Sequence, residues 1–228
     1  MNAFTLGVGA ADSRLGTRFM LGVSALLASF VVLVALVEKR AAPFGAVDAT
    51  LAFAVFGWGI PVVAYSAVAR ASEYGRLDDA VAPLARHGAN RRAAVLGVSF
   101  GAMLRVAVLG ALAAALAVFV AAGHASAGVI RDAATSAWIG ALGGAVYVFW
   151  FSLGSLFGRL GRGRFVLFVL DAVFGSATTL LAAPWPRAHL RSLLGGDAVL
   201  GMPEWQSTAA LYFLAAACLV IGAIRVPK

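Results

Sequence analysis

Long apolar stretches separated by short polar segments run through the whole chain, and each stretch is continuous rather than alternating. A helix that crosses the hydrocarbon core of a bilayer needs about 20 mostly apolar residues. Six stretches are near this length, at about 19–37, 49–69, 93–122, 137–158, 165–183 and 208–224. The pattern therefore predicts six transmembrane helices.

The amino-acid composition agrees with a helical membrane protein. Hydrophobic residues make up 62% of the 228 residues and charged residues 12%, which is about half the charged share of a soluble domain. Strands of a membrane barrel would alternate apolar and polar residues over about ten positions, and these stretches do not. We therefore expect an all-α polytopic bundle of six transmembrane helices, forming a single domain over residues 1–228.

Basic residues are distributed unevenly between the two sides that these spans define. Lys and Arg are enriched in the cytoplasmic loops of membrane proteins. One side carries 12 of the 18 basic residues, namely Arg14, Arg18, Arg70, Arg76, Arg86, Arg91, Arg92, Arg159, Arg162, Arg164, Arg225 and Lys228. The other side carries five, namely Lys39, Arg40, Arg131, Arg187 and Arg191. The asymmetry predicts that both the N and the C terminus are cytoplasmic.

The same asymmetry explains the net charge of +8 without nucleic acid as a partner. The composition is rich in Ala and Gly and favours Arg over Lys, which suggests a bacterium with a GC-rich genome. We therefore expect a multi-pass protein of the bacterial cytoplasmic (inner) membrane, with the lipid bilayer as its surroundings.

The segment 70–92 is the longest predicted cytoplasmic loop between two spans. Leu77, Val81 and Leu84 recur at helical spacing and share one face. Acidic residues come early in this segment and Arg86 comes late, as suits the dipole of a helix. Pro83 predicts a bend or a second short helix. Such an amphipathic element either lies in the membrane interface or docks into the groove of a soluble partner.

This loop resembles a known segment. Gly75-Arg76-Leu77-Asp78, followed by Pro83-Leu84, Arg86 and Arg91-Arg92, is similar to the segment between spans two and three of ABC-2-type permeases. The six-span layout with both termini inside and the chain length are similar as well. Two positions differ from the family pattern: Arg76 stands where threonine is frequent, and no lysine is found near the start of the third span.

The resemblance implies the membrane subunit of an ATP-binding cassette transporter, most often an exporter, that works as a dimer. The loop would be a coupling helix that seats in a cleft of a separate ABC-type ATPase subunit. The second permease would be another copy of this chain or a related chain. The candidate coupling residues are Gly75, Leu77, Asp78, Val81, Pro83, Leu84 and Arg86.

The chain has no phosphate-binding Gly-x-x-x-x-Gly-Lys-[Ser/Thr] motif, and its only lysines are Lys39 and Lys228. We therefore expect no enzyme activity and no cofactor on this chain, with ATP and Mg²⁺ held by the partner ATPase. The alternative is a non-transporting membrane scaffold or assembly factor that recruits a soluble partner through the same loop.

Two ionisable residues fall within the predicted spans, Arg105 in the third and Asp171 in the fifth. A charge in the hydrocarbon core costs roughly 2.5–3.5 kcal/mol on insertion scales. Three interpretations follow: the two residues pair, Arg105 reaches the cytoplasmic headgroups, or the charges act in substrate binding or gating. The last outward loop, 184–207, is either an interfacial loop anchored by tryptophans or a lid over an exit path.

Metal chemistry finds little support in the sequence. His87, His124 and His189 are dispersed over two faces of the predicted topology, whereas zinc, diiron and haem sites need clustered or paired ligands. Small residues four apart indicate close helix packing instead. They occur in the fourth span at Gly140, Gly144, Gly154 and Gly158.

Overall fold

The computed structural model describes residues 2–122 and 128–227, and every regular element in these residues is helical. Five helical segments are long and apolar enough to cross a membrane, which indicates a multi-pass membrane protein. These segments are Thr17–Ala41 (α2), Pro43–Ala71, Arg91–Ala122 (α7), Val129–Ser155 (α8) and Glu204–Arg225 (α11).

Shorter helices complete the chain, and one of the long segments is itself composite. The segment Pro43–Ala71 consists of η1 (Pro43–Gly45), α3 (Ala46–Thr50), the π-helix η2 (Leu51–Gly59) and α4 (Ile60–Ala71). The remaining helices are α1 (Ala3–Leu15), α5 (Leu77–Ala80), α6 (Ala82–Arg86), η3 (Arg159–Gly161), α9 (Gly163–Phe174), η4 (Leu180–Ala182), α10 (Pro186–Leu193) and η5 (Val199–Gly201).

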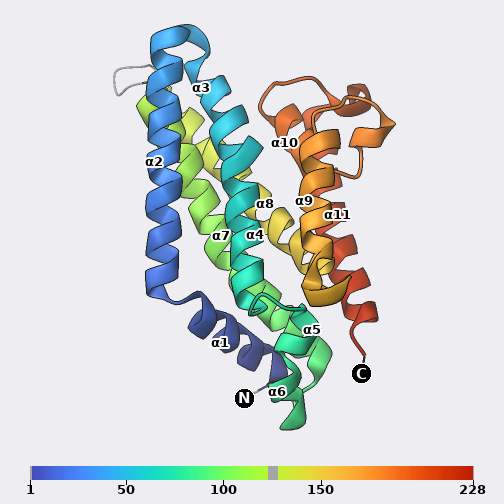
Figure 1. Ribbon diagram of the computed structural model, residues 1–228. Helices are drawn as coiled ribbons and strands as arrows, with labels where there is room; N and C mark the ends of the chain where they lie inside the picture. Colours follow the sequence, from blue (N-terminus) through green and yellow to red (C-terminus); the bar gives the residue numbers. More distant parts are fainter. Residues whose placement is uncertain (1, 123–127, 228) are drawn as a thin grey trace.

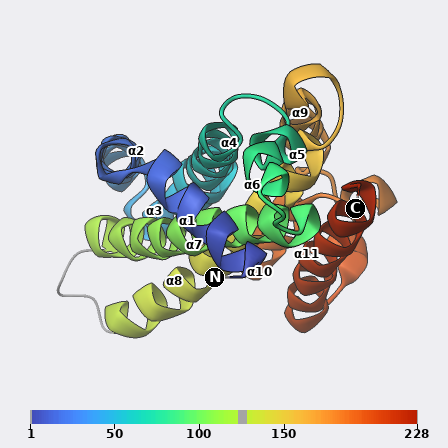
Figure 2. The same ribbon diagram turned by 90° about the horizontal axis from the view of Figure 1, so that it is seen from below.

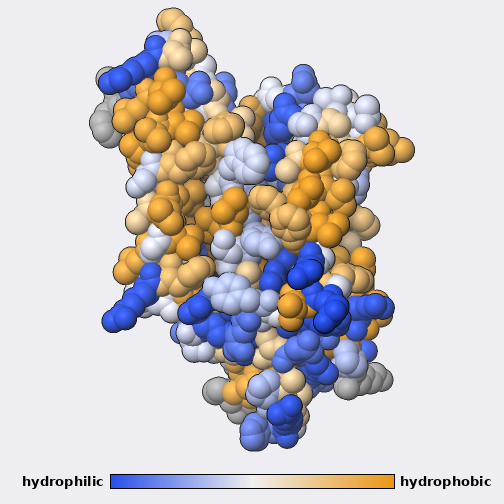
Figure 3. Space-filling view, in the orientation of Figure 1, coloured by the Kyte–Doolittle hydropathy of each residue, from blue (hydrophilic) through white to orange (hydrophobic). Residues whose placement is uncertain are grey.

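The long helices run up and down between two ends of one bundle (Figure 1). Helices α1, α5 and α6 lie at the same end as both chain termini, which we call the proximal end, and α10 lies toward the opposite, distal end (Figure 1). Hydrophobic side chains dominate the face over α2 and α9, and hydrophilic ones gather toward the proximal end (Figure 3). On this face, the surfaces of α2 and α9 are therefore apolar along the middle of the bundle, as expected of helices in contact with a bilayer.

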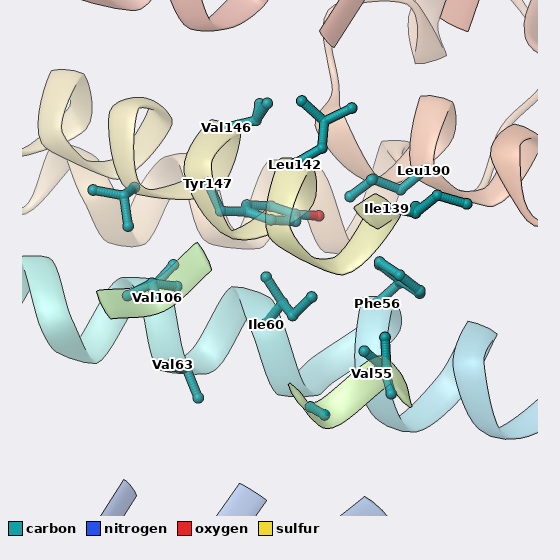
Figure 4. Packing of buried hydrophobic residues seen from close by; sticks show 14 of the residues in the cluster. Val55, Phe56, Ile60, Val63, Val106, Ile139, Leu142, Val146, Tyr147 and Leu190 are labelled. Atoms are coloured by element: carbon teal, nitrogen blue, oxygen red, sulfur yellow. The ribbon is translucent and has the colours of Figure 1, made fainter. Parts of the chain in front are cut away.

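The core lies around α8, where side chains from η2, α4, α7 and α10 meet. Phe56, Ile60, Val106, Tyr147 and Leu190 are all nearly fully buried there (Figure 4). In a core packed this closely, the backbones of two helices can come into direct contact only where small residues lie at the crossing.

The predicted small-residue packing of the fourth span is confirmed at Gly140, Gly144 and Gly154, whereas Gly158 lies beyond the end of α8, in a turn with φ of 76°. Gly140 lies against the backbone of Gly110 in α7, and Gly144 lies against Val106 in the same helix. A methyl group at either glycine would collide with the facing carbonyl, so the two helices approach closely only because both positions lack a side chain. Gly154 packs against Arg164 at the start of α9.

The fifth predicted span is wrong as a single crossing helix. The stretch 165–183 contains most of α9 and the short 3-10 helix η4. The 12 residues of α9 extend about 18 Å, whereas the hydrocarbon core is about 30 Å thick. The helix ends at Gly175, where any side chain would collide with Arg187 of α10. The close approach of α10 is the physical reason that the chain turns here instead of continuing.

Helix α1 is an element that the apolar pattern did not define. Figure 2 shows it crossing α7 at the proximal end. The crossing is tight, because a side chain at Gly7 would collide with Ala94, and one at Gly97 would collide with Phe4. Gly101 of α7 faces Ala11 one turn further on, so the contact is a small-residue seam between two helices.

Candidate functional site: the 70–92 loop and the buried charges

The 70–92 loop folds into two short helices at the proximal end. Helix α5 ends at Ala80, Val81 links the two, and Pro83 is an early residue of α6. Proline is tolerated in the first turn of a helix because the backbone N–H there has no helical partner. The predicted bend at Pro83 is therefore confirmed, and it begins a second helix.

The apolar face of the loop packs inward. Leu77 is 1% exposed and Val81 is fully buried, and both belong to a cluster with Ala94, Val95 and Val98 of α7. Leu84 is half-buried at the margin of this cluster. Leu77 and Val81, which the resemblance suggested as partner contacts, therefore pack against α7 and hold the loop to the bundle.

Arginines from neighbouring helices bind the backbone of the loop. Arg14 of α1 donates hydrogen bonds to the carbonyl oxygens of Ala71 (2.9 Å) and Ala80 (2.7 Å) and pairs with Glu73 (2.8 Å). Arg91 of α7 donates twice to the Asp78 carbonyl, at 3.0 and 2.8 Å. The loop is thus fixed to two helices by charge-assisted hydrogen bonds.

A third arginine, Arg164 at the start of α9, holds the turn that precedes α5. Its guanidinium donates to the Ser72 hydroxyl (2.9 Å), the Gly75 carbonyl (3.0 Å) and the Tyr74 carbonyl (3.2 Å). The side chain is 6% exposed. Glu73 and Tyr74 have φ of 52° and 61°, a conformation that costs a non-glycine residue about 1–3 kcal/mol. Arg164 stabilises this strained turn.

Arg76, two residues before Asp78, favours the ionised form of its carboxyl group. Arg76 contacts both carboxylate oxygens, at 3.0 and 2.9 Å. Burial opposes ionisation, but the hydrogen bonds and positive charge of Arg76 outweigh it and lower the pKa of Asp78. The same pairing raises the pKa of Arg76. The acidic residue of the motif therefore has a structural partner inside the loop.

The loop also has an exposed, mostly polar side. Five of its exposed residues, Tyr74, Asp79, Pro83, Arg86 and His87, are called the docking surface, after the role proposed for them below. Of the seven candidate coupling residues, only Pro83 and Arg86 are on it. Gly75 is half-buried, and its carbonyl is taken by Arg164.

The pairing of Arg105 with Asp171 is wrong, because each has a different partner. Arg105 pairs with Asp12 of α1 and donates to the Gly101 carbonyl at 3.1 Å. Asp171 is 1% exposed and pairs with Arg187 of α10, with 3.3 Å between Nε and the carboxylate. Both partners lay outside the predicted spans, which is why the sequence pattern did not offer them.

Asp171 sits at the junction of α8, α9 and α10. It accepts hydrogen bonds from the Tyr147 hydroxyl (2.8 Å) and from the backbone N–H of Arg187 (3.2 Å). Figure 4 shows Tyr147 within the surrounding core. The buried carboxylate therefore has both a counter-charge and neutral donors, as a charge inside an apolar bundle requires.

Arg187 also satisfies a backbone group in the second long segment. Its Nη2 donates to the Gly57 carbonyl at 2.5 Å. The residue four positions after Gly57 is Pro61, which has no N–H to donate, so this carbonyl has no α-helical donor and lies instead in the π-helix η2. The guanidinium lies 5.6 Å from the Trp58 ring centroid. The irregular stretch around Gly57 and Pro61 is thus bound to α10.

The segment 184–207 is divided between interior and surface. Trp185 is half-buried, stacks on Phe174 at 5.9 Å and meets Trp150 edge-on at 5.8 Å. Trp205 is 68% exposed and so remains a candidate interfacial anchor. Helix α10 between them is largely buried, so this segment is an inserted element of the bundle.

The two histidines in the described part of the chain, His87 and His189, lie in different helical regions. His87 is exposed at the tip of the 70–92 loop, and His189 is buried with Nε2 2.8 Å from the Ala183 carbonyl. His124 lies outside the described residues. Within residues 2–122 and 128–227, no three His, Cys, Asp or Glu side chains come together as a metal site would need.

Sequence reasoning missed three arginines, because Arg14, Arg164 and Arg187 were counted only as topology charges. One signal was available for Arg187: Pro61 leaves a carbonyl without its helical donor, and a nearby cation is a natural substitute. No comparable signal marks Arg14 or Arg164, whose partners are backbone carbonyls of a distant turn.

No protein-family model, no curated protein and no solved structure matches this chain.

Proposed function

We propose that this chain is the membrane-spanning permease subunit of an ATP-driven transporter of the ABC type, working as an exporter. The docking surface would seat on a separate ATPase subunit. The observation that carries the proposal is the 70–92 loop: a compact element outside the bundle, with an exposed tip and with its backbone bound to three helices.

A coupling element must pass force to the helices that move, and this loop is connected in a way that allows it. Arg14 links it to α1, Arg91 to α7 and Arg164 to α9. Arg164 and Asp171 are seven residues apart in α9, about 10 Å along the helix. A push on the loop would therefore act on α9 and, through Asp171, on α10.

The proposed topology keeps both termini and the 70–92 loop in the bacterial cytoplasm. The basic residues support it, since Arg14, Arg76, Arg91 and Arg164 all lie at the proximal end around the loop. In this arrangement α9 and the residues that follow it up to η5 together replace the fifth predicted transmembrane helix. The chain then still crosses the membrane six times.

The transport path would lie between two such chains, either two copies or this chain and a related one. This arrangement is supported by α2 and α11, the least buried of the five long helices. ATP and Mg²⁺ would bind to the partner ATPase.

The test is copurification from the native host in mild detergent. A soluble ATPase should accompany the tagged wild-type chain in stoichiometric amount. Arg86→Glu should remove it, because the change reverses a charge on the docking surface. Arg131→Glu also reverses an exposed charge, on α8, and should retain the ATPase.

If the ATPase stays bound to Arg86→Glu, the docking surface is refuted. If a stoichiometric soluble protein without ATPase activity copurifies instead, the permease proposal fails and the scaffold alternative replaces it.

A further inference from the structure

A cavity lies where α1, α2 and α7 meet, and it has a charged floor and an apolar wall. Its volume is about 670 Å³. The floor carries the Asp12 carboxylate and the Arg105 guanidinium, while Leu104, Val108 and Leu109 line the wall. A site with opposite charges at one end and hydrocarbon at the other is complementary to an amphiphile.

A second, smaller cavity continues the first along the same seam between α2 and α7. Its volume is about 180 Å³, and it shares Ser24 and Leu109 with the larger cavity. Its far end is lined by Leu112 and Leu116. Arg105 and Leu116 are 11 residues apart in α7, or about 16 Å, which matches the thickness of about 15 Å of one bilayer leaflet.

The charged floor lies at headgroup depth. In α2, Arg18 and Glu38 are 20 residues apart with an apolar stretch between them, so they are separated by about 30 Å, the thickness of the hydrocarbon core. Asp12 lies in the last turn of α1, beside Gly16, where the chain passes from α1 into α2 at the proximal end (Figure 1), and is therefore near the proximal edge of that core. The seam runs from there toward the bilayer centre.

The two charges retain capacity for a ligand. Arg105 uses Nη1 for the Gly101 carbonyl and Nη2 for Asp12, out of five N–H groups. Asp12 uses one carboxylate oxygen in this pair, and its side chain is 66% exposed. A phosphate fits the guanidinium and an ammonium group fits the free carboxylate oxygen.

We propose that this seam is a binding site for a glycerophospholipid whose headgroup carries both a phosphate and a primary ammonium, as phosphatidylethanolamine does. The phosphate binds Arg105, the ammonium donates to Asp12, and one acyl chain lies along Leu109 toward Leu116. This inference does not depend on the transport function. It requires only that the chain is embedded in a bilayer.

The test compares phospholipids that differ in their headgroups. The purified protein is equilibrated with equimolar phosphatidylethanolamine, phosphatidylcholine and phosphatidylglycerol, and the retained lipids are measured by native mass spectrometry. Phosphatidylcholine carries the same charges but has no N–H to donate, and phosphatidylglycerol has no cation. We expect at least about a fivefold preference for phosphatidylethanolamine over either competitor.

Three variants separate the headgroup contact from the acyl-chain contact. Asp12→Asn should abolish the preference, whereas Asp197→Asn, at an exposed position in the distal segment, should keep it. Leu109→Trp fills the seam and should lower the total lipid retained. Equal retention of the three lipids by the wild type would overturn the proposal, whether or not the variants fold. So would an unchanged preference in a folded Asp12→Asn protein.

Discussion

The buried pair of Asp171 and Arg187 provides the sharpest energetic test of the structure. Asp171→Leu would leave Arg187 without its counter-charge and Tyr147 without its acceptor. Arg187→Leu would leave Asp171 buried with only neutral donors and would remove the donor to Gly57. Breaking one side of a buried ion pair costs about 3–5 kcal/mol, so each single variant should be strongly destabilised.

The double variant should recover part of this loss, because neither charge then remains buried alone. We expect its destabilisation to be about 2 kcal/mol smaller than the sum of the two single losses. Recovery is incomplete, since the Tyr147 hydroxyl and the Gly57 carbonyl both remain without their partner.

Unfolding in mixed micelles under increasing sodium dodecyl sulfate, followed by the fluorescence of the five tryptophans, measures these free energies. A matched cycle between Arg105→Leu and Asp171→Leu should be additive within about 0.5 kcal/mol, since those residues share no contact in the structure. Additivity for Asp171 and Arg187, or coupling between Asp171 and Arg105, would refute the assignment of partners.

Three further predictions concern the proximal end. Gly7→Leu should lower the free energy of unfolding by about 1–3 kcal/mol, because the new side chain collides with α7. Gly9→Leu projects into open space and should change this free energy little. Equal losses in the two variants would exclude the α1–α7 crossing. Arg164→Met should accelerate tryptic cleavage after Arg76 at least tenfold, since hydrogen bonds to charged groups contribute about 1.5–3 kcal/mol; unchanged cleavage would show that Arg164 does not hold the turn. The pKa of Asp78 is lowered on folding. The ionised side chain therefore contributes fully to the free energy of unfolding above the ordinary pKa of 3.8. This contribution is lost as the pH falls through the lower pKa of the folded state. Asp78→Asn should therefore flatten the loss of stability below about pH 4, and an acid profile identical to wild type would contradict the ion pair with Arg76.

The apolar pattern predicted the long helices because length and hydropathy alone decide whether a segment suits a bilayer. It failed at 165–183 because hydropathy does not register the contact that ends α9. That contact is a close approach between Gly175 and Arg187, two residues 12 positions apart that meet only in the folded chain.

Partners of buried charges were harder to predict than the charges themselves. Arg105 and Asp171 were found because they interrupt apolar stretches, but Asp12 and Arg187 lie outside the predicted spans. The inward face of the 70–92 loop shows the same limit. Helical spacing placed Leu77 and Val81 on one face, yet it could not tell whether that face meets α7 or a separate protein.

Photo-crosslinking in living cells from a single position on the docking surface tests the proposed coupling most directly. A benzoylphenylalanine in place of His87, which is exposed at the loop tip, should crosslink to a soluble ATPase on irradiation. The same probe in place of Ile130, which is 76% exposed on α8, should not. A crosslink from position 87 to lipid alone, or to the same ATPase from both positions, would contradict the account.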